Sequence, residues 1–125
     1  MHVNGLPSSI MAQIQQLESQ DPQALVAVFD AFGYYLYASA GHEQVLGYTA
    51  EELLKSHLSK IVDLPEHHAA YVLRTISVFY RRPIPFSSRL VAKSGTLIPV
   101  AGTLQHFRAP NGVRYFLTSV LIEAI

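Results

Sequence analysis

Residues 30–53 read DAFGYYLYASAGHEQVLGYTAEEL and contain the strongest local signals for the fold. The first four of them have the composition of a turn, in which Gly33 can adopt the positive φ that a tight turn requires. The aromatic run at 34–38 favours a strand, and so does the apolar run at 24–29 on the other side of the turn. We therefore predict a β-hairpin over residues 24–38.

The second half of the same stretch has helical signals. Thr49 and Glu52 have the spacing of a capping box, in which each side chain bonds the backbone N–H of the other residue. Short helical segments are predicted at 41–46, at 49–56 and around 57–62. His42 and His57 lie among polar residues of these segments, so we expect both imidazoles to face solvent.

Residues 1–21 are predicted to form a short lead and an amphipathic helix. Ser8 and Ser9 are residue types that begin helices, and Asp21 precedes a proline, which favours an end. A helix this short needs a packing partner. Its apolar stripe is expected to cover its own domain or to form a homodimer interface, and the two are compatible. The stripe consists of Ile10, Met11, Ile14 and Leu17.

Residues 22–125 are predicted to form one α+β domain. A longer helix at 66–80 follows the short ones, and three β segments come after it, at 84–93, 96–107 and 113–122. Because strands and helices do not alternate one by one, antiparallel pairing is favoured over a parallel sheet. We expect a five-stranded antiparallel sheet with helices on one face, a leading N-terminal helix, and a pocket between sheet and helices.

The composition excludes several classes of function. Nine basic and nine acidic residues give a net charge of zero, so there is no electrostatic footprint for nucleic acid or an anionic membrane. The absence of cysteine excludes disulfides, thiolate metal sites and cysteine nucleophiles. There is no secretory signal, no apolar run of bilayer length and no catalytic motif. We expect a cytoplasmic protein that is not an enzyme and has no catalytic residues.

Three motifs together resemble a PAS domain. Residues 45–53 (VLGYTAEEL), with the turn at 30–33 before them, resemble the first half of that family. Residues 93–96 (KSGT) are similar to the turn between its third and fourth strands, and residues 110–112 to the turn before its last strand. The resemblance covers about 22–122. It implies a sensory signal-transduction module that acts through protein interaction, as a homodimer, and regulates an output domain or partner protein outside this chain.

Part of the long predicted helix resembles the haem-binding oxygen-sensor PAS domains. Residues 68–74 (HAAYVLR) reproduce their H-x-x-Y-x-x-R pattern, and this resemblance implies His68 as an axial haem ligand. His68 lies at the edge of the apolar stripe, where it can face the pocket. Phe86 falls where that subclass has the arginine that contacts oxygen. An exposed or capping His68 is the alternative.

The expected pocket wall combines the long helix with the third and fourth strands. A glycine inside a strand, such as Gly102, often marks the close approach of another group, here a ligand or the long helix. The alternative is that the same residues fill a closely packed core. We expect no cofactor; haem and a metal-free apolar small molecule are the alternatives, and flavin is disfavoured because the Asn-Cys motif is absent. The candidate ligand-binding residues are His68, Val72, Ile76, Phe86, Leu90, Val100, Gly102 and Leu104.

Three further expectations concern the strands. Pro99 lacks the N–H that a sheet ladder uses, so we expect a bulge or an unpaired position there. His106 follows Leu104 at strand spacing and is expected on the same face. Five side chains are expected to give the outer sheet face apolar area for a dimer: Tyr35, Tyr37, Phe107, Tyr115 and Leu117.

Overall fold

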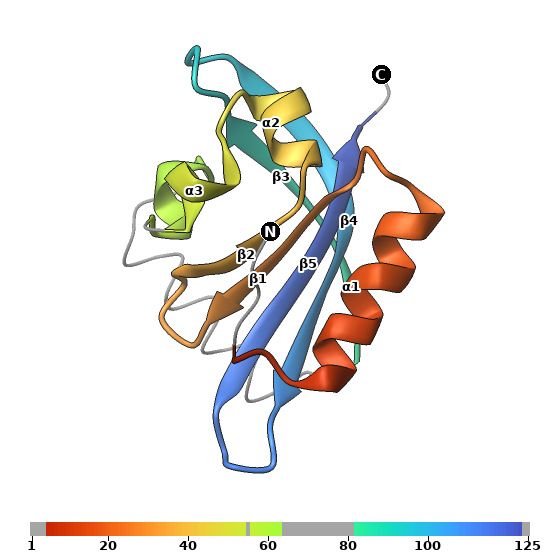
Figure 1. Ribbon diagram of the computed structural model, residues 1–125. Coiled ribbons are helices and arrows are strands. Elements are labelled where there is room, and N and C mark those ends of the chain that lie inside the picture. Colours follow the sequence, from red (N-terminus) through yellow and green to blue (C-terminus); the bar gives the residue numbers. More distant parts are fainter. Residues whose placement is uncertain (1–4, 55, 64–81, 124–125) are drawn as a thin grey trace.

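Five strands form one antiparallel sheet in the order β2-β1-β5-β4-β3 (Figure 1). The computed structural model describes residues 5–54, 56–63 and 82–123, so the helix predicted at 66–80 lies outside the described residues. Every other predicted helix and strand is present, with small shifts of its ends. The strands are β1 Leu25–Asp30, β2 Tyr35–Ala38, β3 Ile84–Val91, β4 Leu97–Arg108 and β5 Arg114–Ile122.

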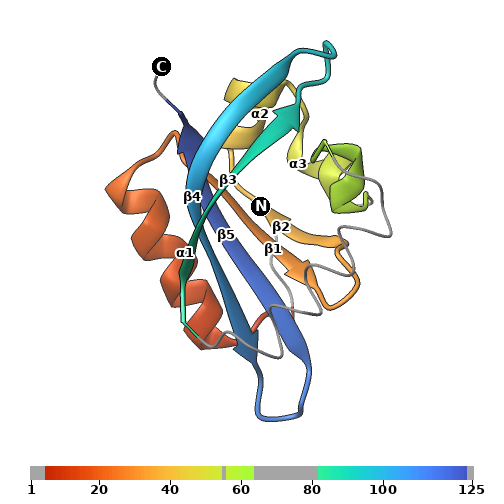
Figure 2. The same cartoon turned by 180° about the vertical axis from the view of Figure 1, so that it is seen from behind.

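Helices lie on both faces of this sheet (Figures 1 and 2). The inner face carries α2 Gly41–Leu46, α3 Ala50–Leu53 and the 3₁₀ turn η1 Leu58–Lys60. The outer face is crossed by α1 Ser8–Gln20. The predicted α+β architecture is confirmed, and the sheet separates two apolar clusters, one on each face.

The turn that joins β1 to β2 forms as its residue types predict. The carboxylate of Asp30 accepts hydrogen bonds from the backbone N–H groups of Phe32 and Tyr34, both at 2.9 Å. Gly33 has φ +94°, a left-handed conformation that costs glycine little. The pairing of β2 with β1 is irregular: Val28 pairs with Tyr37, but Phe29 pairs with Tyr35. This bulge changes the face of the sheet to which the side chains at the start of β2 point.

The predicted capping box begins α3. The Thr49 hydroxyl accepts from the backbone N–H of Glu52 at 3.2 Å, and the Glu52 carboxylate accepts from the backbone N–H of Thr49 at 3.0 Å. The same carboxylate accepts a hydrogen bond from Lys93 at 2.8 Å. Because Lys93 lies in the turn between β3 and β4, this ion pair connects that turn to the short helices.

The apolar stripe of α1 packs on the outer face of its own sheet. Ile10 and Ile14 are 1% and 4% exposed, and burial on this scale contributes about 1.5–3 kcal/mol per side chain. The helix begins after Pro7 without a side-chain cap, so Ser8 and Ser9 lie in its first turn and do not cap it. The buried outer cluster contains Ile10, Ile14, Ala24, Val26, Val28, Tyr37, Tyr115 and Leu117.

The strand positions singled out in β4 have structural explanations. The register between β3 and β4 continues without a break through Pro99, which pairs with Arg89, so the expected bulge there is wrong. The group close to Gly102 is the backbone of the neighbouring strand β5. A Cβ atom on Gly102 would lie 1.9 Å from the carbonyl oxygen of Ser119. Among the described residues, the close approach of the paired strand β5 accounts for this glycine.

Candidate functional site

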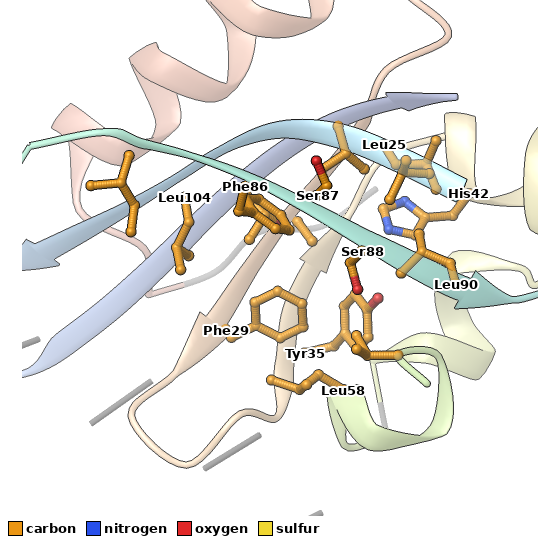
Figure 3. Close-up of a pocket in the computed structure, with 16 residues that line it drawn as sticks. Leu25, Phe29, Tyr35, His42, Leu58, Phe86, Ser87, Ser88, Leu90 and Leu104 are labelled. Atoms are coloured by element: carbon orange, nitrogen blue, oxygen red, sulfur yellow. The ribbon is translucent and has the colours of Figure 1, made fainter. Parts of the chain in front are cut away.

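The inner face of the sheet holds a cavity of about 280 Å³ (Figure 3). Leu104 and Phe86 lie toward one end, and His42 and Leu90 lie toward the other. Most of the surrounding side chains are apolar, as is typical of small-molecule pockets. We call this space the inner-face cavity. Its described lining consists of Leu25, Ala27, Phe29, Tyr35, His42, Leu58, Val62, Ile84, Phe86, Ser87, Ser88, Leu90, Val100, Leu104, Thr118 and Val120.

Four of the candidate ligand-binding residues line the cavity. Phe86 and Leu90 come from β3, and Val100 and Leu104 come from the paired strand β4. Alternation along each strand places these residues on one face of the sheet. Whether they bind a ligand stays a prediction.

The other candidates do not contribute to the described lining. His68, Val72 and Ile76 lie outside the described residues, so the predicted axial haem ligand cannot be placed. Gly102 lies beside the backbone of β5, as described above, and is not among the lining residues.

His42 reaches the cavity from the first turn of α2 and is only 2% exposed. The expectation that it faces solvent is therefore wrong. Gly41 brings the start of this helix against β1: a Cβ there would lie 2.5 Å from the carbonyl oxygen of Ala24. Burial lowers the pKa of His42 to about 4, although the backbone of Ser39 partly opposes this shift. The imidazole is therefore neutral near pH 7.

The hydrogen bonds of Ser39 determine which ring nitrogen of His42 carries the proton. The Ser39 hydroxyl donates its one hydrogen to the carbonyl oxygen of Ala24 at 3.0 Å and accepts from the N–H of Val26 at 2.9 Å. Nδ1 of His42 lies 3.2 Å from the Ser39 carbonyl oxygen and 3.4 Å from its hydroxyl oxygen. Both oxygens can only accept from it, so Nδ1 is protonated and Nε2 is a bare acceptor.

Tyr35 also lines the cavity and is 5% exposed. The prediction that it lies on the outer face is wrong, because the bulge between β1 and β2 turns it inward while Tyr37 stays outward. Its ring meets that of His42 edge-on, with centroids 5.8 Å apart. Burial raises the pKa of the Tyr35 phenol well above its usual range, so the hydroxyl remains protonated.

The remaining polar groups of the described lining are hydroxyls, from Ser87, Ser88 and Thr118. With His42 neutral, no described lining residue carries a charge. The described residues also include no group of three or more histidine, aspartate, glutamate or cysteine side chains placed to hold a metal ion. The cavity is thus suited to an uncharged molecule.

The other two described histidines, His57 and His106, do not line the cavity and instead contact other parts of the fold. His57 is 9% exposed, which contradicts its expected solvation. Its Nδ1 accepts from the backbone N–H of Ser59 at 3.1 Å, so Nε2 carries the proton that it donates to the Phe32 carbonyl oxygen at 2.7 Å. His106 stacks at 5.2 Å on Phe116, a residue of the inner cluster, which agrees with its predicted face.

Comparison with solved structures identifies the architecture. The chain is similar to a PAS domain from a two-component sensor histidine kinase, with 16% identity and a TM-score of 0.69 over 94% of this chain and 100% of that one. A PAS domain from Desulfitobacterium hafniense has 22% identity and a TM-score of 0.67, over 81% and 93%. The PAS-B domain of Drosophila melanogaster Cycle, with bound ethylene glycol, has 14% identity and a TM-score of 0.65, over 79% and 99%.

The sequence itself matches no protein-family model and no curated protein. The structural likeness shows that the chain has the PAS fold, as the motifs in residues 30–53 and 93–96 predicted.

Among the described residues, no helix combines the length and apolar character that crossing a membrane requires.

Proposed function

We propose that this PAS-fold chain is the sensory module of a signalling protein, and that its input is a small, mainly apolar molecule bound in the inner-face cavity. The observation that carries the proposal is the cavity itself, about 280 Å³ and bordered by side chains of the inner cluster. Small-molecule sites are typically concave and mostly apolar. The PAS domains of sensor kinases among its structural neighbours support the signalling role.

The size of the cavity limits the ligand. An engineered apolar cavity of about 150 Å³ binds benzene. The inner-face cavity is nearly twice as large, so it suits one ring with a short substituent. An apolar wall of this kind favours such a molecule through the removal of its surface from water.

The output of the module is proposed to pass through the sheet to α1 and from there to a homodimer partner or an output domain. The strands under the cavity also contact α1, because alternate residues point to opposite faces. On β5, for example, Phe116 belongs to the inner cluster, whereas Tyr115 and Leu117 belong to the outer one. The Tyr37 hydroxyl, on β2, donates a hydrogen bond to Glu18 of α1. A ligand that shifts the strands would therefore shift α1.

Native mass spectrometry of the 125-residue chain, with a panel of uncharged one-ring compounds, tests the input. Leu104→Trp should fill the cavity and abolish uptake. Leu97→Trp is the matched control, because Leu97 lies on the same strand, is 45% exposed and does not line the cavity. The proposal is wrong if the wild-type chain takes up no compound, or if Leu104→Trp takes up as much as the control.

Haem ligated by His68 is the alternative input, and a visible spectrum separates it from the first. The described lining contains no cation that could pair with the haem propionates. The resemblance to the haem-binding subclass puts Phe86 near the place where that subclass has its oxygen-contacting arginine. We expect the protein to show no sharp Soret band after incubation with haemin. A Soret band that His68→Ala abolishes would replace our proposal with a haem sensor.

A further inference from the structure

Two side chains that line the cavity each present a polar atom without a hydrogen-bond partner among the described residues. These atoms are Nε2 of His42 and the hydroxyl of Tyr35, whose residues are 2% and 5% exposed. An unsatisfied polar atom in a buried position costs free energy, so native structures normally supply a partner. Both residues line the same cavity, and their rings are neighbours. A molecule in the cavity that bonded both atoms would supply a partner to each.

The two atoms have complementary requirements. Nε2 of His42 is an acceptor, because the proton of this ring is held on Nδ1 against Ser39. The Tyr35 hydroxyl is protonated and has a hydrogen to donate. A hydroxyl satisfies both atoms, because it can donate to Nε2 and accept the hydrogen of the phenol. An ether or a ketone can accept only, and a hydrocarbon can do neither.

From this pairing we infer that the ligand carries an uncharged hydroxyl, or an equivalent donor-acceptor group, held between Nε2 of His42 and the Tyr35 hydroxyl, with its apolar body directed toward Phe86 and Leu104. The inference rests on the proposed function, whose ligand it specifies as a small aryl or alkyl alcohol. An anion such as a carboxylate is disfavoured, since it would lie beside a bare acceptor with no described cation in the lining.

A matched pair of probes tests the inference on the 125-residue chain at pH 7.5. 4-Ethylphenol and 4-ethyltoluene share their ring and ethyl group, and only the phenol can hydrogen bond. Binding is followed by amide chemical-shift changes in NMR titrations, which also report the location of the probe. We expect both probes to perturb residues of the cavity lining.

Two variants then remove the two proposed ligand contacts one at a time. Tyr35→Phe deletes the hydroxyl alone, and His42→Phe replaces the acceptor with a carbon ring. Each should weaken the binding of 4-ethylphenol roughly fivefold to tenfold, as expected for one net hydrogen bond, and change that of 4-ethyltoluene less than about twofold. Because Tyr35→Phe is nearly isosteric, it decides the outcome if His42→Phe does not fold.

The results distinguish a failure of this inference from a failure of the proposed function. If 4-ethyltoluene binds in the cavity and both variants weaken the two probes equally, the inference is wrong and the apolar sensor remains. That result would leave an ordered water as the partner of the two polar atoms. If neither probe perturbs the lining of the wild-type chain, both the inference and the proposed function fail.

Discussion

Nδ1 of His42 lies 3.2 Å from the backbone carbonyl oxygen of Ser39. This contact connects a residue that lines the cavity to the residue that directly follows β2. The side chain of the same serine bonds the backbone of Ala24 and Val26 at the start of β1. One residue therefore stabilises the entry to β1 and fixes the orientation of the only described imidazole that lines the cavity. Changes at either position should be detectable as changes in stability.

The stability of the protein should depend on pH through His42. Its pKa is about 4 in the folded state, against 6.5 for an unperturbed imidazole. Between these values the unfolded chain binds a proton that the folded chain does not. The contribution of His42 to the free energy of unfolding is therefore complete above about pH 6.5. It is lost as the pH drops toward 4, and the total loss is about 3 kcal/mol. Urea unfolding at several pH values between 7.5 and 4.5 measures this slope.

His42→Phe is the control for that slope, because carboxyl groups titrate in the same range in both proteins. Tyr35, the titratable group whose ring meets that of His42, stays neutral throughout this range. The wild type should lose more stability than the variant as the pH falls. Equal slopes in the two proteins would show that His42 is not buried as a neutral group.

Ser39→Ala should destabilise the protein by about 2–6 kcal/mol. The substitution leaves the N–H of Val26 and the carbonyl of Ala24 without this partner, and each unsatisfied buried group costs about 1–3 kcal/mol. Ser87→Ala, at an exposed position of β3, should change stability by less than about 0.5 kcal/mol. Chemical denaturation of both variants measures the difference, and similar values for the two would contradict the proposed role of the Ser39 hydroxyl.

Features of the fold that depend on neighbouring residues were predictable from the sequence. The capping box of Thr49 and Glu52 and the turn at Gly33 both form, since each needs only a few consecutive residues. The bulge that turns Tyr35 inward was not predictable, because it depends on how β2 aligns with β1. Strict alternation would have kept Tyr35 and Tyr37 on one face.

The same division applies to the candidate site. Leu90 and Leu104 were predicted as parts of the apolar pocket wall, and alternation along each strand explains why they share a face. His42 was missed because its neighbours Glu43 and Gln44 are polar and indicate an exposed helix. Its burial results from the docking of Gly41 against β1, a contact between segments that the local pattern does not report. Gly41 is the one signal that could have indicated it, since a glycine at a helix start permits such an approach.

Gly102→Ala should be severely destabilising, by at least about 3 kcal/mol. The added Cβ would lie 1.9 Å from the Ser119 carbonyl oxygen and 2.7 Å from Cα of Val120, so the central strands would have to separate. Thr103→Ala, at the next and exposed position, is the control and should be nearly neutral. Thermal unfolding compares the two. A stable Gly102→Ala protein would mean that β4 and β5 do not approach each other at Gly102 as closely as described.

The last prediction concerns the stripe of α1, which the sequence left open between a cover for its own domain and a dimer interface. Ile14 is 4% exposed within the single chain, so Ile14→Ala should cost about 2–5 kcal/mol of unfolding free energy. Gln16→Ala, on the exposed side of the helix, should cost almost nothing.

Urea unfolding and sedimentation of each variant over a range of concentrations separate the two hypotheses. If Ile14→Ala destabilises the chain at every concentration without changing its mass, the stripe serves the fold, and a homodimer must use other residues. If it instead converts a dimer to an equally stable monomer, Ile14 contacts a second chain and the packing of α1 on its own sheet is wrong.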